Sequence, residues 1–321
     1  MSERPLTVML VAAEASGDDR GAHLARALKR RLGEGVRLVG VGGARMRAEG
    51  VESPFDISEV SILGLLEGLM AWRKVVRRAD EAADLAERER PDIAVLIDSW
   101  GFTLRVAQRL RRRFPGMPVV KYVAPQVWAS RPGRARTTAE TFDLLLTIHV
   151  FDAPAFQREG LETVFVGDST LALDFGAADP ARMRERIGAG PQEPILLVAP
   201  GSRPSEIQRV LPAFEDAVRI LKAERPGLHV VVLAAPTVAA TVKARVAGWP
   251  RGCHVVEGEA AKRDAMTAAT VALACSGTVT TELALAGCPV VVGYRLGPVT
   301  HAILKRLIRT KYVTLFNIAA Q

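Results

Sequence analysis

Asp98 is the residue in this sequence with the clearest chemical potential. It directly follows the apolar run Ile93–Ile97 and precedes the segment Ser99–Phe102 (Ser-Trp-Gly-Phe). If the run is a strand, the carboxylate lies at its carboxyl end, where α/β sheets bind their ligands. An aspartate in that place can act as general base on the hydroxyl of an acceptor. The alternative is an Asx-type cap on the helix that follows.

A loop in the second half of the chain has the composition of a phosphate site. The segment Pro200–Arg203 (Pro-Gly-Ser-Arg) follows an apolar run and precedes a helical pattern that contains Glu206. The Arg203 guanidinium can give two parallel hydrogen bonds to a phosphate, and we expect free backbone donors beside it. The segment is not a Walker loop, because the Gly-Lys-Ser/Thr ending is missing. A plain turn with a helix-capping serine is the alternative.

A second loop complements the first one. Ser276, Gly277 and Thr278 offer hydroxyl and N–H groups to a diphosphate. Glu282 lies one turn into the helix that we expect next, where its carboxylate can accept hydrogen bonds from ribose hydroxyls. A start resembling a capping box would also explain Thr278 and Glu282, although their spacing is one residue off the ideal. Together with Arg203, this loop predicts a single nucleotide site.

A third segment of small residues stands near the N-terminus. Glu14–Asp18 (Glu-Ala-Ser-Gly-Asp) separates the first apolar run from the helix that we expect around Ala22–Arg31. Small residues let backbone N–H groups approach a ligand, and a helix N-terminus favours anions. We therefore predict that Ser16, Gly17 and Asp18 bind substrate. The alternative is a capped helix start, with Ser16 or Asp18 as the N-cap.

An apolar stretch next to four cations is the candidate membrane-facing element. Its apolar residues recur at helical spacing: Ile62, Leu65, Leu66, Leu69 and Trp72. The cations follow directly: Arg73, Lys74, Arg77 and Arg78. Such a face suits a helix lying on an anionic membrane surface. A core-facing helix with a solvated basic end is an equally good explanation.

The elements that position these residues follow from apolar runs that alternate with longer helical patterns. Runs without internal alternation are typical of parallel strands buried on both faces. We expect strands at Thr7–Val11, Val36–Val41, Ile93–Ile97, Val119–Val123, Leu144–Ile148, Thr163–Val166, Ile195–Ala199, His229–Leu233, His254–Val256, Val271–Ala274 and Val290–Val292. The pattern restarts after residues 174–193, which predict a helix and a linker. The fold class is α/β, with two doubly wound Rossmann-like domains, residues 1–172 and 173–321, facing an interdomain cleft.

The composition narrows the classes of function. The chain has 321 residues and a net charge of +8, which suits phosphates or an anionic membrane face unless it reflects genome composition alone. No zinc spacing or basic stretch interleaved with aromatics is present, so we expect no metal and no nucleic-acid partner. An odd cysteine count of three favours reduced cytosolic thiols. We see no signal peptide and no apolar run of about 20 residues, and therefore expect a cytoplasmic protein that does not cross the membrane.

The ordered set of motifs resembles the lipid-A-disaccharide synthase family of endotoxin biosynthesis. The resemblance rests on Val11–Asp18, Gly40–Met46, Ile97–Ser99, Tyr122–Ala129, Pro200–Arg203, Ser276–Thr278, Val291–Arg295 and Lys311–Asn317. It implies a GT-B fold and an inverting transfer without metal or other cofactor. The implied donor is UDP-2,3-diacylglucosamine and the implied acceptor is 2,3-diacylglucosamine 1-phosphate (lipid X). The implied products are the β-1,6-linked disaccharide 1-phosphate and UDP.

The resemblance also implies roles for residues and a place in the cell. The family's functional carboxylate falls on Asp98. Its UDP-side positions fall on Arg203, Ser276, Gly277, Thr278, Glu282 and Asn317. The family is peripheral to the inner membrane of Gram-negative bacteria, which favours the interfacial interpretation of Val60–Trp72. A homodimer is compatible with the sequence.

The chain departs from the family pattern in several places. Trp100-Gly101-Phe102 replaces a Pro-Asp-Phe step, Gly167-Asp168 replaces a Gly-His or Gly-Asn step, and Ser130 replaces a tryptophan. Family members also continue with helices beyond the position of Gln321, so we expect those helices to be missing here. Two other functions therefore stay open. One is another GT-B enzyme, such as a UDP-N-acetylglucosamine transferase or 2-epimerase, and the other is a paralogue that binds UDP-sugar or lipid without catalysis.

Overall fold

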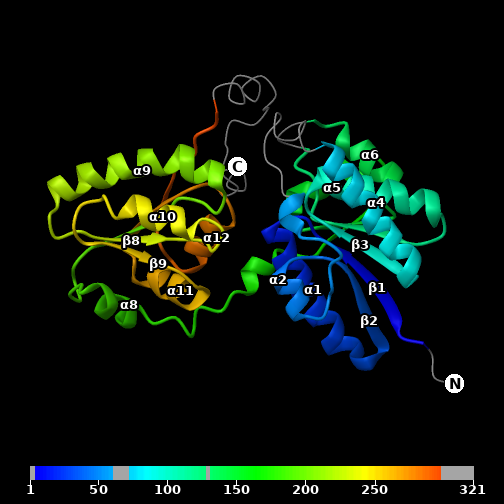
Figure 1. The fold of residues 1–321 in the computed structure, drawn as a ribbon, viewed down its shortest axis with the longest axis horizontal. Helices are drawn as coiled ribbons and strands as arrows, with labels where there is room; N and C mark the ends of the chain where they lie inside the picture. The colour runs from blue at the N-terminus through cyan, green and yellow to red at the C-terminus, as the bar shows by residue number, and fades with distance from the viewer. Residues whose placement is uncertain (1–3, 61–71, 128–130, 298–321) are drawn as a thin grey trace. The chain divides into compact units, whose positions relative to one another are not determined.

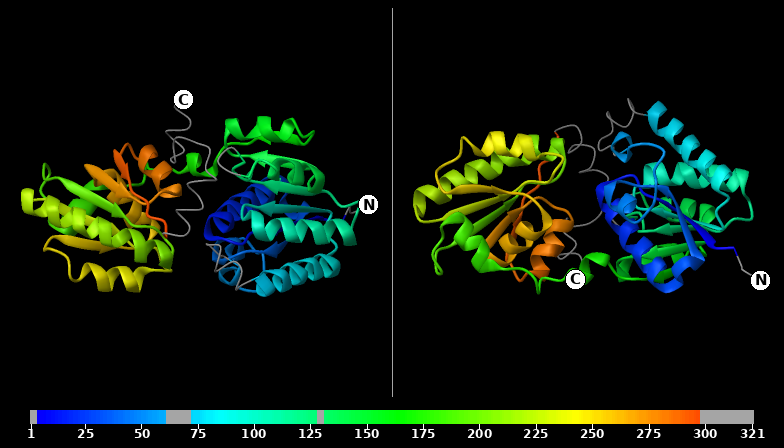
Figure 2. Two further views of the ribbon diagram at one scale, coloured as in Figure 1. Left: turned by 90° about the horizontal axis from the view of Figure 1, so that it is seen from above. Right: turned by 60° about the horizontal axis from the view of Figure 1, so that its bottom comes forward.

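The computed structural model describes residues 4–60, 72–127 and 131–297, which fold into two compact α/β units. Unit 1 extends to Ser169 and unit 2 begins at Thr170. Each unit contains one parallel sheet with helices packed against it (Figures 1 and 2). We describe each unit by itself.

The sheet of unit 1 has six strands in the order β2-β1-β3-β4-β5-β6. The strands are β1 (Leu6–Val11), β2 (Val36–Val41), β3 (Ile93–Ile97), β4 (Val119–Tyr122), β5 (Leu144–Thr147) and β6 (Glu162–Phe165). The helices are α1 (Ala15–Leu32), α2 (Ala44–Ala48), α4 (Trp72–Glu89), α5 (Trp100–Arg113), α6 (Arg134–Thr141) and α7 (Ala153–Gln157). The chain adds β2 on one side of β1 and then β3 on the other side. The carboxyl ends of β1 and β3 therefore lie side by side at a switch point of the sheet, a position where such folds bind ligands.

The sheet of unit 2 has five strands in the order β11-β10-β7-β8-β9. The strands are β7 (Ile195–Ala199), β8 (His229–Leu233), β9 (Cys253–Val256), β10 (Val271–Ala274) and β11 (Val290–Val292). The helices are α8 (Pro180–Ile187), α9 (Pro204–Glu224), α10 (Ala239–Val246), α11 (Glu259–Ala268) and α12 (Thr278–Leu285). The central strand is β7, which pairs with β10, so the loops after these two strands are neighbours at one edge of the sheet.

Burial on both faces explains why the strands are continuous apolar runs. In β1, Met9 and Val11 belong to one buried cluster, while Val8 and Leu10 belong to the cluster on the other face. Because neither face meets solvent, no polar residue alternates with the apolar ones. This explains why every predicted strand is found, with ends that differ from the prediction by at most one residue.

The start of α1 corrects one prediction. The segment expected as a small-residue loop is already helical, because α1 begins at Ala15 with Glu14 as its N-cap. Neither Ser16 nor Asp18 caps the helix. A Cβ atom on Gly17 would lie 3.3 Å from the Cβ atom of Ala12 and 3.6 Å from the carbonyl oxygen of Ile97. The small residues therefore let the first turns of α1 pack closely on the sheet.

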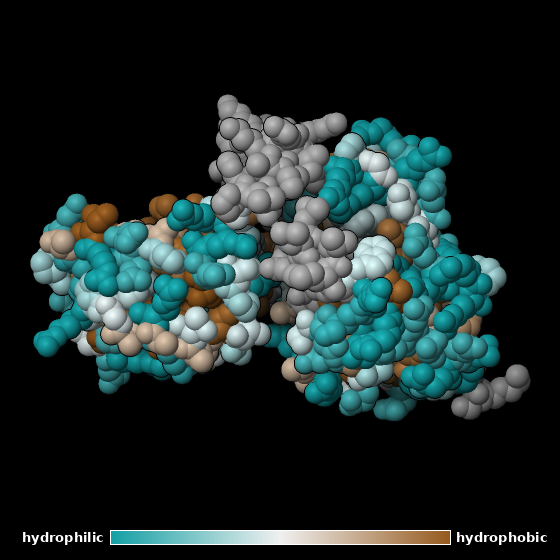
Figure 3. Space-filling view, turned by 45° about the horizontal axis from the view of Figure 1, so that its top comes forward, coloured by the Kyte–Doolittle hydropathy of each residue, from teal (hydrophilic) through white to brown (hydrophobic). Residues whose placement is uncertain are grey.

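The outer surface matters for the membrane hypothesis. In the space-filling view, the described surface is largely hydrophilic, with separate hydrophobic patches on both units (Figure 3). Among the described residues, no helix is long and apolar enough to span a bilayer.

Candidate active site

The turn from β3 to α5 carries Asp98 at the carboxyl end of the strand, as the sequence predicts. Asp98 and Ser99 both have left-handed backbone angles, with φ of +52° and +34°. Non-glycine residues adopt this conformation rarely, and backbone strain of this kind is frequent at functional sites. Ser99, not Asp98, is the N-cap of α5, so the carboxylate is not used as that cap. The Asp98 side chain is 34% exposed and therefore accessible to a substrate.

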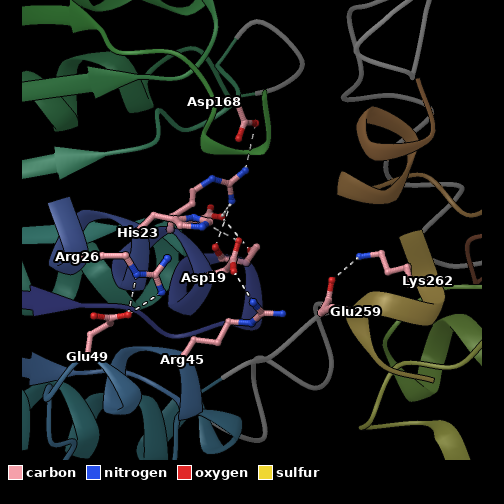
Figure 4. A network of polar contacts seen from close by, with 11 residues as sticks. Asp19, His23, Arg26, Arg45, Glu49, Asp168, Glu259 and Lys262 are labelled. Atoms are coloured by element: carbon pink, nitrogen blue, oxygen red, sulfur yellow. Dashed lines mark hydrogen bonds and ion pairs between the residues drawn. The ribbon is translucent and has the colours of Figure 1, made fainter. Parts of the chain in front are cut away.

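An arginine joins the Asp98 carboxylate to a second acid. The Oδ2 atom of Asp98 accepts a hydrogen bond from the Ser16 hydroxyl at 3.2 Å and lies 3.5 Å from Nη1 of Arg20. The Nη2 atom of Arg20 lies 3.4 Å from Oδ2 of Asp168 (Figure 4). The side chains of Arg20 and Asp168 are almost entirely buried. The cation thus holds two carboxylates at one edge of the sheet, and Asp168 is the residue that departs from the family's Gly-His or Gly-Asn step.

At the same edge, Tyr122 is the last residue of β4 and His149 follows β5. Burial raises the pKa of the Tyr122 hydroxyl, and Arg20 partly offsets this effect. Burial lowers the pKa of His149, while the negative charge of Asp168 opposes the change. Both side chains are therefore uncharged near neutral pH. The spacing of these residues in the sequence did not predict that they lie together, because they come from separate elements of unit 1.

Asp18 has a structural role that the sequence did not indicate. Its carboxylate accepts backbone hydrogen bonds from Gly43 at 2.7 Å and from Arg45 and Met46 at 3.0 Å. The residue is only 5% exposed. Its carboxylate thus satisfies the N–H groups at the start of α2 and is turned away from solvent. Of the three residues predicted to bind substrate in this segment, Ser16 alone hydrogen-bonds Asp98 within the described part of the chain.

We expect Asp18→Ala to lower the free energy of unfolding by roughly 3 kcal/mol, because buried N–H groups lose a charged acceptor. Urea unfolding followed by circular dichroism measures this change. Asp19→Ala is the matched control, since Asp19 is a partly exposed neighbour whose ion pair with Arg45 spans 3.0 Å (Figure 4). Exposed pairs contribute about 0–1 kcal/mol, so this variant should be nearly as stable as the parent. Equal losses in the two variants would contradict the role of Asp18.

The predicted membrane-facing stretch is described only at its end. Ile62, Leu65, Leu66 and Leu69 lie outside the described residues. Trp72, the first residue of α4, is 51% exposed, and the Arg105 guanidinium lies 4.1 Å from its ring centroid. In the basic segment after it, Lys74 and Arg78 pair with Glu59 at 3.5 Å and 2.7 Å. These pairs reduce the positive charge that the sequence predicts for a lipid surface.

The turn from β7 to α9 lies at the carboxyl end of β7, at the edge of the sheet of unit 2 where we expect the nucleotide. Gly201 has a φ of +114°, and a Cβ atom there would lie 2.4 Å from the Glu206 carboxylate. Glycine is therefore required at this position for both conformation and space. Arg203 is the N-cap of α9, and its side chain is partly exposed beside the turn. Its Nη1 atom lies 3.2 Å from Oε1 of Glu206.

The backbone N–H groups beside Arg203 are not free, contrary to the sequence prediction. We expected them to be free for a phosphate, but the Oε2 atom of the buried Glu206 accepts from Ser202 at 2.9 Å and from Arg203 at 3.2 Å. The carboxylate one turn into the helix reaches back to the helix start, as in a capping box. The Thr237 hydroxyl also donates to the Ser202 carbonyl at 2.7 Å. These hydrogen bonds occupy the backbone groups of the loop, so the guanidinium is its principal group for an anion.

The loop after β10 lies beside this turn. The Cys275 N–H donates to the Ala199 carbonyl at 2.8 Å, which ties the ends of β10 and β7 together. Gly277 and Thr278 are exposed at the start of α12. Inside the turn, the Thr280 hydroxyl donates to the Gly277 carbonyl at 2.7 Å. An exposed helix start next to a guanidinium is a suitable site for a diphosphate.

Glu282 has a partner that the sequence did not indicate. Its carboxylate lies 2.6 Å from Nζ of Lys262 on α11 and is mostly buried. A ribose hydroxyl would therefore share this carboxylate with the lysine. Asn317, the remaining predicted UDP-side residue, lies outside the described residues.

Tyr294 also belongs to this edge of unit 2. Burial raises the pKa of its hydroxyl, and the negative charge of Glu206 adds to the effect. Burial likewise raises the pKa of Cys275 to about 12, so this thiol is not a nucleophile at neutral pH. In the part of the chain that the structure covers, no group of three or more His, Cys, Asp or Glu residues could hold a metal ion.

A family model described as lipid-A-disaccharide synthetase matches residues 8–321. The lipid-A-disaccharide synthase of Rhodospirillum centenum is 43% identical over 315 residues, which cover 98% of this chain and 79% of the relative. That of Rhodopseudomonas palustris is 44% identical over 321 residues, covering 98% and 80%. The matches extend over both units.

Solved structures share the fold at low sequence identity. The MnaA–UDP structure from S. aureus has a TM-score of 0.64 and 15% identity, covering 89% of this chain and 78% of that one. A UDP-GlcNAc 2-epimerase from Neisseria meningitidis, bound to UDP-GlcNAc, has a TM-score of 0.62 and 12% identity, covering 93% and 85%. MurG of Acinetobacter baumannii has a TM-score of 0.53 and 16% identity, covering 94% and 82%. These likenesses and the two parallel sheets confirm the predicted GT-B fold.

Proposed function

The chain belongs to the lipid-A-disaccharide synthase family of glycosyltransferases, and from this membership we propose the reaction that it catalyses. It transfers 2,3-diacylglucosamine from the UDP derivative to lipid X, forming the β-1,6-linked disaccharide 1-phosphate and UDP. The observation that carries the proposal is the family match over residues 8–321. The accessible carboxylate of unit 1 and the Arg203 loop of unit 2 supply groups that suit this chemistry.

The donor binds at the edge of unit 2. Arg203 and the start of α12 hold the diphosphate, and Glu282 and Asn317 contribute to binding the nucleoside. Support comes from the tie between the ends of β7 and β10, which brings the two loops together. The related folds of MnaA and the Neisseria epimerase were solved with UDP and UDP-GlcNAc. The guanidinium stabilises the negative charge on UDP as it leaves, which provides electrophilic assistance to the reaction.

The acceptor reacts at the edge of unit 1. Its 6-hydroxyl attacks C1 of the donor sugar, the bond between C1 and the UDP oxygen breaks, and the configuration at C1 inverts. Asp98 takes the hydroxyl proton as general base. The Ser16 hydroxyl and Arg20 both contact Oδ2 of Asp98, which fixes the orientation of the carboxylate. Support for this role is the exposure of Asp98 at a strand end within an otherwise buried polar cluster.

The defining test is the reaction itself. The protein is incubated with UDP-2,3-diacylglucosamine and lipid X, and products are identified by mass spectrometry while UDP release is followed. We expect UDP and the disaccharide 1-phosphate in equal amounts. Conversion of UDP-N-acetylglucosamine to its 2-epimer would instead support the epimerase alternative. UDP binding without any release in the presence of both lipids would support the non-catalytic alternative.

The proposal includes peripheral attachment to the cytoplasmic face of a Gram-negative inner membrane through the stretch Val60–Trp72. Support comes from the exposed Trp72 and from the apolar spacing of the sequence before it. We expect the protein to float with vesicles containing anionic phospholipid, and the double variant Leu65→Glu and Leu69→Glu to stay in solution. Ile220→Glu is the control, because Ile220 is an apolar residue that is 60% exposed on α9, outside the predicted membrane-facing stretch. Failure of the parent to bind vesicles would remove this part of the proposal.

A further inference from the structure

A lysine is buried beneath the turn that carries Asp98. Lys121 lies on β4, directly opposite Leu96 of β3, and is only 1% exposed. Charged side chains are almost never buried to this extent unless polar groups surround them. The Nζ atom of Lys121 donates to the Thr103 hydroxyl at 3.0 Å, to the Leu96 carbonyl at 3.4 Å, and to the Asp98 carbonyl. Three N–H groups of an ammonium therefore meet three oxygens.

Two of these contacts act on the left-handed turn itself. The Asp98 carbonyl accepts from Lys121 and also from the Thr103 hydroxyl at 2.9 Å. The same hydroxyl lies 3.1 Å from the Ser99 carbonyl. Thr103 is fully buried on α5, so strand, turn and helix are joined through one polar cluster. Backbone strain at Asp98 and Ser99 persists only if surrounding contacts hold it.

We propose that Lys121 is a positioning residue for the transfer reaction, which holds the Asp98 turn so that the carboxylate faces the acceptor hydroxyl. This inference rests on the proposed role of Asp98 as general base. Lys121 itself touches no substrate, because its amino group is enclosed by the Leu96, Asp98 and Thr103 oxygens. It acts through the backbone of the turn.

Because the Lys121 amine can lose its charge, its positioning of the Asp98 turn should depend on pH. Burial lowers the pKa of this amine to about 7, while the negative charges of Asp98 on the turn and Glu14 at the N-cap of α1 oppose the change. As pH rises through 7, the ammonium loses a proton and is left with two donors for three acceptors. The turn is then held less firmly, so kcat should fall on the alkaline side with an apparent pKa near that of the lysine.

Lys121→Met tests the inference, because methionine fills a similar volume without a donor. We expect kcat for UDP release to fall about 10- to 100-fold with KM for the donor changed less than about twofold, since small displacements of a catalytic group have such effects. The alkaline decline of kcat near pH 7 should disappear. Lys222→Met is the matched control, because Lys222 also donates to two backbone carbonyls, Pro226 at 3.1 Å and Leu228 at 2.7 Å. Its kcat and pH profile should equal those of the parent.

A second variant keeps the test decisive if Lys121→Met does not fold. Thr103→Val removes the other donor to the Asp98 carbonyl without changing charge, and it should lower kcat while keeping the alkaline decline. A folded Lys121→Met protein with kcat within twofold of the parent and an unchanged pH profile would overturn the inference, as would a fully active Thr103→Val protein. An inactive parent with an inactive Lys222→Met control would instead count against the proposed function.

Discussion

Asp98→Asn should lower kcat by a factor of about 10² to 10⁴, which is the usual contribution of a positioned general base. Asparagine has the shape of aspartate but cannot accept the proton of the acceptor hydroxyl. KM for the UDP donor should change little, because the donor site that we propose lies at the edge of unit 2 and not beside Asp98. Steady-state UDP release over a range of both lipid concentrations measures the two parameters separately.

The structure predicts that this loss is not caused by unfolding. The backbone hydrogen bond from Asp98 N–H to the Tyr122 carbonyl, at 2.9 Å, does not depend on the side chain. The contacts of Lys121 and Thr103 are likewise with the Asp98 carbonyl. Asp19→Asn serves as the control for removing one negative charge from this unit, and it should keep normal turnover. A folded Asp98→Asn protein with near-normal kcat would exclude Asp98 as the base.

The strands and the loops after them could be predicted from the sequence because the signals are local. A buried parallel strand needs a continuous apolar run, and β7 and β10 show such runs, each followed directly by one of the two loops that we propose as the donor site. The start of α1 could not be placed in this way. Its Ser-Gly-Asp residues are typical of turns, and only contact with Ala12 and Ile97 shows why Gly17 is helical there.

The buried polar cluster of unit 1 was missed for a different reason. Arg20 and Asp168 are 148 residues apart, so no spacing rule relates them. Their pairing arises because the start of α1, after β1, and the segment after β6 lie at the same edge of one sheet. A departure from the family pattern at Asp168 was the only signal in the sequence. Lys121 was missed because a lysine within an apolar run indicates an edge or solvent position, whereas tertiary contacts bury this one.

The Pro200–Arg203 loop lies between a strand and a helix, as the sequence predicts, but the expectation of free backbone donors in it was wrong. Glu206 could be seen in the sequence, but its reach back to the Ser202 and Arg203 N–H groups depends on the bend at Gly201. With those donors occupied, the anion-binding capacity of the loop depends mainly on the guanidinium. Arg203 is therefore more important for anion binding than the sequence alone suggested.

Arg203→Ala should therefore reduce kcat by about 10²- to 10³-fold, the range seen when one donor that stabilises developing negative charge is removed. It should also weaken UDP binding measured by calorimetry, because the diphosphate loses its strongest partner. Arg203→Lys should be intermediate, since an ammonium keeps the charge but cannot give two parallel hydrogen bonds. The loop should keep its shape in both variants, because the Glu206 contacts are with backbone N–H groups.

The control for this substitution lies on the same helix. Arg219 of α9 is half exposed and pairs with Glu215 at 2.7 Å, so Arg219→Ala removes an equal charge from the same element. Its UDP affinity and turnover should equal those of the parent. If Arg203→Ala bound UDP as tightly as Arg219→Ala and turned over as fast, the proposed role of Arg203 would be excluded, and among the described residues the start of α12 would be the remaining candidate for holding the diphosphate. Because that site offers only backbone and hydroxyl dipoles, UDP affinity would then depend weakly on ionic strength, whereas binding to the Arg203 guanidinium requires it to fall as salt is added.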